Sequence, residues 1–256
     1  MPSVVVERRG STGVLTLDRA EKRNPLSSSA MAEFTAAVRE LGADPDIAVV
    51  LVRARGPAFS AGHDLGELVG AELADQHEIF RLCTGMMQAV QQVPQPVVCQ
   101  VQGAALAAGC QLVASCDLAV AAEGAVFGPP GVRIGLFCST PMVPVSRAVG
   151  RKRALQMLLT GEPISAATAA DWGLINEVVP AEQLEDRAWE LAGAVAAASP
   201  LTLRIGKEAF YRQIDLPQDE AYEQMADVMA TNAVTCDAQE GMRAFLDKRD
   251  PVWTGE

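Results

Sequence analysis

The sequence predicts a single α/β domain, with strands concentrated in the first half of the chain and helices in the second. Three observations predict this. Up to about residue 139, apolar runs of strand length alternate with apolar residues at helical spacing. Beyond residue 139 the pattern is almost wholly helical. No low-complexity linker or repeat divides the chain. With 256 residues, 49% of them hydrophobic, the chain is long enough to bury a sizeable core.

The elements of the first half follow from their apolar patterns. Residues 4–8 and 13–18 predict a pair of strands, followed by a polar turn at 19–24. Further strands are predicted at 47–52, 97–101 and 117–122, the first of them apolar throughout, as is typical of a strand covered on both faces. Helical spacing predicts helices through two sets of apolar residues, Met31, Phe34, Val38 and Leu41, then Ile79, Leu82, Met86, Val90 and Val93.

The second half is predicted to be almost entirely helical. A clear apolar stripe marks one helix, through Leu184, Ala188, Leu191 and Val195. We therefore expect one domain spanning 1–256, with an α/β core over about 1–195 and a helical C-terminal region over about 196–256.

Composition excludes several classes of protein. A net charge of −11 argues against nucleic-acid binding, because it leaves no excess of cations to neutralise phosphates. No apolar run approaches the roughly 20 residues of a membrane span. The N-terminal residues mix acidic and basic side chains instead of forming an apolar signal segment, so a cytoplasmic protein is expected. The six cysteines form no CxxC pair and no cluster with the two histidines, so no metal site is expected.

Two segments rich in small residues, 59–65 and 103–111, each lead from a predicted strand into a predicted helix. The first N–H groups of a helix lack partners within it and carry partial positive charge. Small side chains allow a ligand oxygen to approach such donors closely. If the two segments face each other, they form an oxyanion hole, in which one donor contributes about 2.7–4 kcal/mol to a transition state.

In this order, the two segments resemble the crotonase (enoyl-CoA hydratase/isomerase) superfamily, and the resemblance extends over about residues 12–250. Further matching motifs lie at 22–27, 115–121, 127–130, 150–161, 170–179 and 240–249. Within the superfamily the chain is most similar to the mitochondrial-type enoyl-CoA hydratase-domain-containing proteins. The resemblance implies a spiral of ββα units with a helical C-terminal trimerisation region, and a homotrimer or a dimer of trimers.

The resemblance also implies roles for particular residues. The oxyanion donors would be the backbone N–H groups of His63 and Ala108. Family hydratases place two catalytic glutamates where this chain has Gln111 and Gly131. Glutamine is no general base at neutral pH and glycine has no side chain, and each missing group typically forfeits about 10²–10⁴ in rate. Ordinary hydration is therefore not expected, and restoring both glutamates is expected to raise it.

Other groups near these positions are candidates to replace the glutamates. Cys138 or Ser139 would act as a nucleophile, and Asp64 would serve an acid–base role. The structural alternatives are a turn at a helix start with Ser139 as N-cap, and Asp64 capping its own helix. A bound anion in the room left by Gly131 is a further alternative.

The resemblance implies an acyl-CoA thioester as substrate, with coenzyme A as part of it, no covalently bound cofactor and no metal. Lys22 and Arg23 would contact the phosphates of coenzyme A or, alternatively, only solvate their turn. Lys248 would reach coenzyme A from a neighbouring subunit. The residues expected to contact the substrate are Lys22, Arg23, Leu26, Ser60, Ala61, His63, Asp64, Leu65, Ala108, Phe245 and Lys248.

Three functions remain open on the sequence alone. The favoured one is an acyl-CoA lyase or isomerase with unconventional acid–base groups. The second is a non-catalytic acyl-CoA-binding or regulatory subunit. The third is a thioesterase or decarboxylase-like enzyme that uses the same oxyanion hole.

Overall fold

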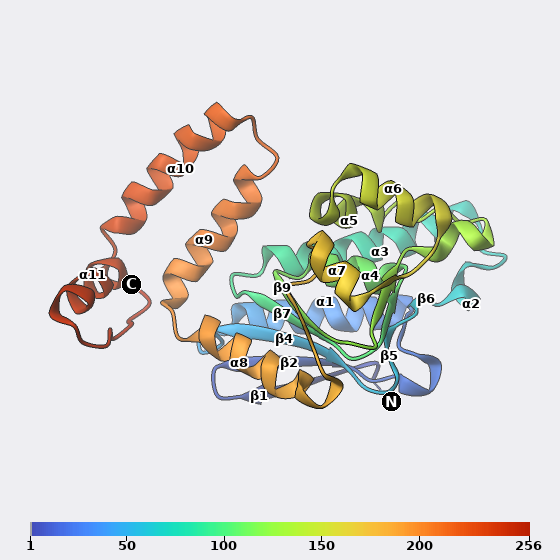
Figure 1. Cartoon of the computed structure of the whole chain (residues 1–256), viewed down its shortest axis with the longest axis horizontal. Coiled ribbons are helices and arrows are strands. Elements are labelled where there is room, and N and C mark those ends of the chain that lie inside the picture. Colours follow the sequence, from blue (N-terminus) through green and yellow to red (C-terminus); the bar gives the residue numbers. More distant parts are fainter. Residues whose placement is uncertain (1) are drawn as a thin grey trace.

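The centre of the molecule is a six-stranded, mostly parallel sheet (Figure 1). The structure is a computed structural model, and it describes residues 2–256. Only the first strand runs antiparallel to its neighbour. In spatial order the strands are β1 (Val4–Arg9), β2 (Thr12–Leu17), β4 (Val49–Ala54), β7 (Val97–Val101), β9 (Leu118–Ala122) and β12 (Glu177–Val179).

Helices cover both faces of this sheet, which explains the continuous apolar run in β4. Val49 and Leu51 belong to the cluster that includes Ala188 of α8 (Leu184–Ala196). Val50 and Val52 face the opposite way and belong to the larger core with Phe34. That larger core contains the apolar faces of α1 (Ser28–Ala43) and α3 (Leu73–Gln92). The predicted strand with two covered faces is confirmed.

Two smaller sheets are built from strands of two or three residues, too short to predict from periodicity. A four-stranded sheet has the order β11 (Ile164–Ser165), β10 (Val126–Gly128), β8 (Ala104–Leu106) and β5 (Ala58–Ser60). A two-stranded parallel sheet joins β3 (Pro25–Leu26) to β6 (Gly62–His63). These short strands carry both glycine segments into the helices that follow them, α2 (Leu65–Leu68) and α4 (Ala108–Ser115).

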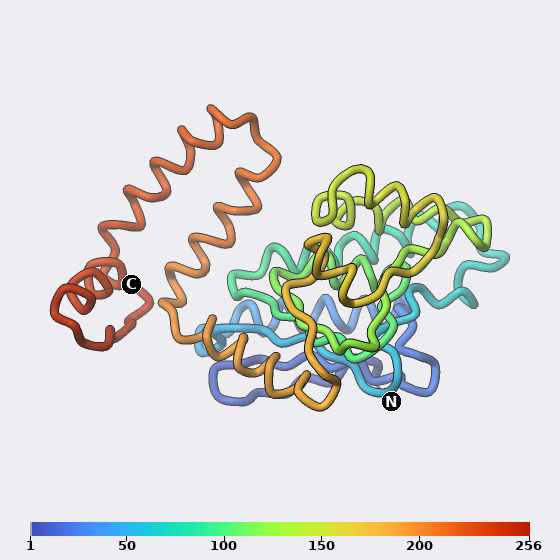
Figure 2. Tube along the Cα trace, viewed as in Figure 1, coloured from blue at the N-terminus to red at the C-terminus, as the bar shows by residue number. Residues whose placement is uncertain are grey.

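The second half is helical, as predicted, apart from β11 and β12. Three 3₁₀ turns lie at Ala20–Lys22, Pro130–Ile134 and Ala181–Gln183. Next to the core lie α5 (Met142–Val149), α6 (Arg151–Thr160) and α7 (Ala166–Trp172). The last three helices form an arm that extends away from the core, as Figure 2 shows: α9 (Pro200–Gln213), α10 (Gln218–Ala233) and α11 (Cys236–Asp247).

The first helix of this arm is anchored to the core by a buried ion pair. Lys207 Nζ lies 2.7 Å from a carboxylate oxygen of Asp117, and the Lys207 side chain is only 6% exposed. The ammonium also donates to the carbonyls of Val90 and Gln95, each at 2.9 Å. The Tyr211 hydroxyl donates to the other Asp117 oxygen at 2.8 Å. The ammonium and both carboxylate oxygens thus have partners, as a buried charge requires.

Among residues 2–256, no helix is both long and apolar enough to cross a membrane. Within the same part of the chain, no three His, Cys, Asp or Glu side chains are grouped so that they could hold a metal ion.

Candidate functional site

A cavity of about 1020 Å³ lies where β6 and α2 meet the loop that joins η2 (Pro130–Ile134) to α5. Most of its wall is apolar or backbone, and its charged side chains are few. Its lining includes Lys22, Ala61, His63, Asp64, Leu65, Leu68, Phe80, Ala107, Gly131, Arg133, Ile134, Leu136, Phe137, Cys138, Ser139 and Thr140. Five of the expected substrate contacts and most of the candidate catalytic positions thus share one cavity.

The two glycine segments meet at the edge of this cavity. A β-carbon built on Gly62 would lie 2.7 Å from the β-carbon of Ala107 and 3.2 Å from the backbone nitrogen of Ala108. A β-carbon built on Gly109 would lie 2.5 Å from the carbonyl oxygen of Ser60. Only glycine permits this approach of β6 to the start of α4, which is the packing reason for a glycine in each segment.

The backbone directions make both expected donors available. The Asp64 N–H donates to the carbonyl of Leu26 on β3 at 3.4 Å. Successive residues of an extended strand face opposite sides, so the His63 N–H points away from β3. Ala108 is the first residue of α4, and its N–H therefore has no partner within the helix. Ala108 is fully buried directly behind Ala107, which lines the cavity.

Ser60 has a structural role and not the expected substrate contact. Its side chain is fully buried; its hydroxyl donates to the Asn24 carbonyl at 2.8 Å and accepts from the Gly62 N–H at 3.2 Å. The Asn24 side chain bonds in turn to the backbone of Arg19, Arg55 and Ala58. This network fixes the segment before the first donor.

Gln111 is buried, and its side chain is directed toward another helix. It is 3% exposed, and its Oε1 accepts a weak hydrogen bond from the Cys83 thiol of α3 at 3.6 Å. It lines a neighbouring cavity of about 600 Å³ between α3, α4, α5 and α9, and Thr140 lines both cavities. The Gln111 amide thus lies outside the larger cavity.

Gly131 leaves no room for a side chain or for a bound anion beside its α-carbon. A β-carbon there would lie 2.7 Å from the Cys138 sulfur and would overlap the Leu136 carbonyl oxygen. The expectation that the missing side chain creates space is wrong, because the loop from Leu136 to Cys138 folds back into that space. The Gly131 carbonyl accepts from the Leu136 N–H at 3.0 Å, which closes the loop.

The two candidate nucleophiles lie in the cavity wall, and among the described residues neither is hydrogen-bonded to a basic side chain. Cys138 is 8% exposed, and burial raises the pKa of its thiol despite a hydrogen bond from the Gly131 backbone. Ser139 is exposed, and its hydroxyl donates to the Phe137 carbonyl at 3.4 Å. The expectation of Ser139 as an N-cap is wrong, because α5 begins at Met142 and is preceded by Pro141.

Asp64 caps its own helix, which confirms the structural alternative for this residue. Its carboxylate accepts from the Gly66 N–H at 3.0 Å, at the start of α2. One turn later, Glu67 ties α2 to the start of α1 through Ser28, whose N–H and hydroxyl donate to one Glu67 oxygen at 2.7 and 2.8 Å. Both carboxylates thus have structural roles at α2.

The His63 ring is packed inside the cavity wall. Its edge meets the Phe80 ring at a centroid distance of 5.3 Å and an interplanar angle of 78°. Its Nε2 is buried and has no hydrogen-bond partner among the described residues. Burial lowers the pKa of His63, and the nearby Glu67 carboxylate opposes that shift, so the ring is neutral at pH 7.

Several expected substrate contacts lie away from the cavity. Arg23 is exposed but outside the lining, and Leu26 is a core side chain, 1% exposed. Phe245 and Lys248 lie at the far end of the arm, distant from β6 and α2 (Figure 1). Phe245 is 83% exposed, so within one chain it contacts neither the cavity nor the core.

Sequence reasoning missed several residues of the cavity wall, above all Phe80, Arg133 and Leu136. Phe80 lies next to the predicted stripe of α3, and the stripe alone could not place it. Leu136 and its neighbour Phe137 are 41% and 38% exposed. Apolar residues in a glycine-flanked loop were the available signal, because exposed apolar clusters mark binding sites.

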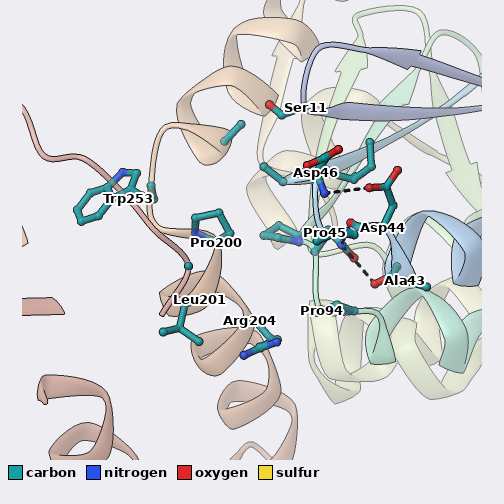
Figure 3. Close-up of a pocket in the computed structure, with 18 of the residues that line it drawn as sticks. Ser11, Ala43, Asp44, Pro45, Asp46, Pro94, Pro200, Leu201, Arg204 and Trp253 are labelled. Atoms are coloured by element: carbon teal, nitrogen blue, oxygen red, sulfur yellow. Dashed lines mark hydrogen bonds between the residues drawn. The ribbon is translucent and has the colours of Figure 1, made fainter. Parts of the chain in front are cut away.

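A second cavity, of about 540 Å³, separates the core from the arm (Figure 3). Asp44 and Asp46 line it on the core side, and Leu201, Arg204 and Trp253 line it on the arm side. It lies apart from the glycine segments, and its walls are the turn after α1 and the start of α9. It is a cleft between two parts of the chain and contains none of the expected site residues.

Comparison with known proteins gives a consistent assignment. The family model described as enoyl-CoA hydratase/isomerase matches residues 7–256. Rat enoyl-CoA hydratase domain-containing protein 3, mitochondrial, is 46% identical over 94% of this chain and 80% of its own length, and the human protein of that name is 44% identical over the same shares. A crystal structure of an enoyl-CoA hydratase from Mycobacterium smegmatis superposes with a TM-score of 0.97 and 42% identity, covering 99% of each chain.

These comparisons confirm two expectations and overturn one. The crotonase-type fold is confirmed, as is the similarity to the enoyl-CoA hydratase-domain-containing proteins, including the human crystal structure, with a TM-score of 0.95 and 41% identity over 98% of this chain and all of that one. The expectation of a cytoplasmic protein is contradicted, because the similar rat and human proteins are named mitochondrial. The mixture of acidic and basic residues at the N-terminus was too weak a basis for that expectation.

Proposed function

The chain belongs to the enoyl-CoA hydratase/isomerase family, and we propose that it binds an acyl-CoA thioester with the carbonyl oxygen between the N–H groups of His63 and Ala108. The observation that carries this proposal is the approach of Gly62 to the start of α4, within 3.2 Å of the Ala108 nitrogen measured from a built β-carbon. Two donors held this close to one apolar cavity favour an oxygen that gains negative charge.

We propose further that the protein does not hydrate enoyl-CoA by means of a pair of carboxylates. Gln111 is turned toward Cys83, and the loop from Leu136 to Cys138 fills the space beside Gly131. The lining of the cavity contains one carboxylate, that of Asp64, and this group caps α2. The cavity therefore polarises a carbonyl without a pair of carboxylates to move a proton.

A second proposal is decarboxylation of an acyl-CoA that carries a carboxylate on its α-carbon. In that reaction CO₂ leaves, its bonding electrons become the enolate held by the two donors, and water supplies the final proton. No protein base is needed to form the enolate, which suits a cavity of this composition. Lys22 and Arg133 in the wall supply positive charge for the leaving carboxylate. A thioesterase nucleophile is less well supported, because burial keeps the Cys138 thiol protonated.

Coenzyme A would extend from the cavity mouth toward Lys22, and a second subunit would bring its Lys248 and Phe245 to the same ligand. The support is the arm, whose helix α10 has no buried residue and exposes Tyr222 and Met229, each 71% accessible. An apolar helix face of this extent favours a partner. We therefore propose a homotrimer or a dimer of trimers assembled through the arm.

Calorimetric titration tests the ligand assignment by comparing butyryl-CoA with S-butyl-CoA, a thioether that lacks the carbonyl oxygen. The protein is expected to prefer the thioester by about tenfold, the effect of one to two hydrogen bonds. Equal affinities would contradict the proposal. In His63→Pro, which removes one donor, the preference should shrink while the affinity for S-butyl-CoA stays unchanged.

The reaction is tested with two substrates in parallel. Crotonyl-CoA should show no hydration above the His63→Pro control. Malonyl-CoA and its 2-alkyl derivatives should release CO₂ faster with the wild-type protein than with that variant. Efficient crotonyl-CoA hydration would overturn the account of the missing carboxylates. Absence of CO₂ release from every derivative would overturn the decarboxylation proposal and leave the ligand assignment standing.

A further inference from the structure

We infer that Ala107 is a positioning residue, which fixes the direction of the Ala108 N–H and its separation from the His63 N–H. This inference rests on the proposed oxyanion site and adds to it the residue that holds its two halves in register. Ala107 immediately precedes α4 and lines the cavity. Three features of its backbone and side chain support this positioning role.

The first feature is an unfavourable backbone conformation. Ala107 has φ 49° and ψ −119°, a combination that a residue with a β-carbon rarely adopts. Among the described residues only three other non-glycine residues have positive φ, and they lie in the turn at Arg23 and Asn24 and at the end of α11. Residues in such conformations persist where the surrounding structure imposes them, and they cluster at functional sites.

The second feature is that Ala107 is held on both sides by hydrogen bonds. Its N–H donates to the Gly128 carbonyl on β10 at 2.8 Å, and its carbonyl accepts from the Gln111 N–H of α4 at 3.0 Å. The peptide before Ala107 therefore belongs to the sheet and the peptide after it belongs to the helix. The unusual φ and ψ produce the turn between them, and that turn sets the direction of the Ala108 N–H.

The third feature is the contact of its methyl group with the other half of the site. The β-carbon of Ala107 lies 2.7 Å from the point that a β-carbon on Gly62 would occupy, so the methyl group packs against the Gly62 α-carbon. Gly62 has φ 93° and directly precedes the first donor, His63. One methyl group thus acts as the spacer between the strand that carries one donor and the helix that carries the other.

The variant Ala107→Gly separates positioning from folding. Glycine adopts the observed φ without strain, so the melting temperature should stay unchanged or rise. It also removes the spacer and lets the turn move. We therefore expect the ¹³C carbonyl resonance of bound [1-¹³C]butyryl-CoA to lose much of the downfield shift seen with the wild type. The affinity for butyryl-CoA should fall about two- to tenfold, the range for one weakened hydrogen bond, with no change for S-butyl-CoA.

Two control variants test whether the effect is due to the loss of the Ala107 methyl group. Ala107→Ser retains the β-carbon and should keep the wild-type carbonyl shift. Ala104→Gly removes a methyl group from the same segment, on β8, away from the Gly62 contact, and should leave the carbonyl shift unchanged. A wild-type carbonyl shift in Ala107→Gly, at equal affinity, would overturn the inference and leave the oxyanion site intact. If the wild-type protein itself produces no shift, the proposed function fails, and this inference fails with it.

Discussion

The thiol sulfur of Cys138 lies 2.7 Å from the point that a β-carbon on Gly131 would occupy. The position at which family hydratases carry their second glutamate is thus closed by its own loop, which returns through Leu136 to Cys138. This position thus has neither a carboxylate nor room for one. A catalytic pair that is absent for this reason is not restored by side-chain substitution alone.

The first prediction concerns this closure. Gly131→Ala should lower the free energy of unfolding by about 1–3 kcal/mol, because a β-carbon overpacks the loop against Cys138 and Leu136. Urea unfolding measures the loss. Gly124→Ala is the matched control, since a β-carbon there meets no atom within 4 Å, and it should change stability by less than about 0.5 kcal/mol.

The same closure changes the expected outcome of restoring both glutamates. The double variant Gln111→Glu with Gly131→Glu should remain inactive toward crotonyl-CoA, because the second glutamate displaces the loop instead of entering the cavity. This replaces the expectation from sequence that the exchange raises hydration. A steady-state assay of both single variants and the double variant decides it, and a clear gain in the double variant would show that the loop adapts.

A second prediction concerns the anchor of the arm. Lys207→Met leaves Asp117 charged and without its cation in a partly buried position, so stability should fall by about 3–5 kcal/mol. Hydrogen exchange should rise first in α9, where Tyr211 shares the same carboxylate. Arg81→Met breaks an exposed pair with Glu78 and serves as the control, with a much smaller expected loss because the pair is solvated. Equal losses for the two variants would contradict the assigned role of Lys207.

A third prediction concerns pH. The folded-state pKa of His63 is lowered, first by burial, with Glu67 opposing, so the unfolded chain binds more protons between that pKa and about 6.5. Stability from this group is therefore present above about pH 6.5 and is lost as the pH falls toward the folded-state value, with a slope of at most about 1.4 kcal/mol per pH unit. Urea unfolding of the wild type should weaken more between pH 7 and pH 5 than that of His63→Asn. Parallel curves would show that the ring is not buried as described.

A fourth prediction concerns assembly through the arm. Met229→Glu with Val234→Glu places charge on apolar side chains that are 71% and 76% exposed in one chain, so folding of the chain should be unaffected. If the arm joins subunits, sedimentation should show the wild type as a trimer or hexamer and the variant as a monomer. Glu223→Lys, an exchange at an exposed polar position on α10, is the control. A wild-type monomer at micromolar concentration would contradict the proposed assembly.

The sequence predicted the elements whose apolar periodicity is long, and it failed where structure depends on close backbone contacts. The strand at residues 97–101 and the helix containing the Leu184 stripe lie where predicted. The strands β5, β6, β8 and β10 have two or three residues, which is too few for a period to register. They are nevertheless the elements that bring Gly62 and Ala107 together.

For the site, the sequence indicated which two glycine segments would meet but could not describe the space around them. The family resemblance predicted that the segments of His63 and Ala108 meet, and the structure places His63 and Ala107, the residue before Ala108, in the wall of one cavity. That Gly131 is closed by its own loop, and that Ser60 is wholly internal, depends on backbone paths several residues away. Such paths leave no trace in residue type or spacing.

If this cavity polarises a thioester carbonyl through two backbone donors, the bound carbonyl itself responds to them. The measurement is the ¹³C resonance of [1-¹³C]butyryl-CoA, free and bound to the wild-type protein. The account predicts a downfield shift on binding that is reduced in His63→Pro while binding of S-butyl-CoA persists. A bound carbonyl resonance equal to that of the free thioester, at saturating protein, would contradict it.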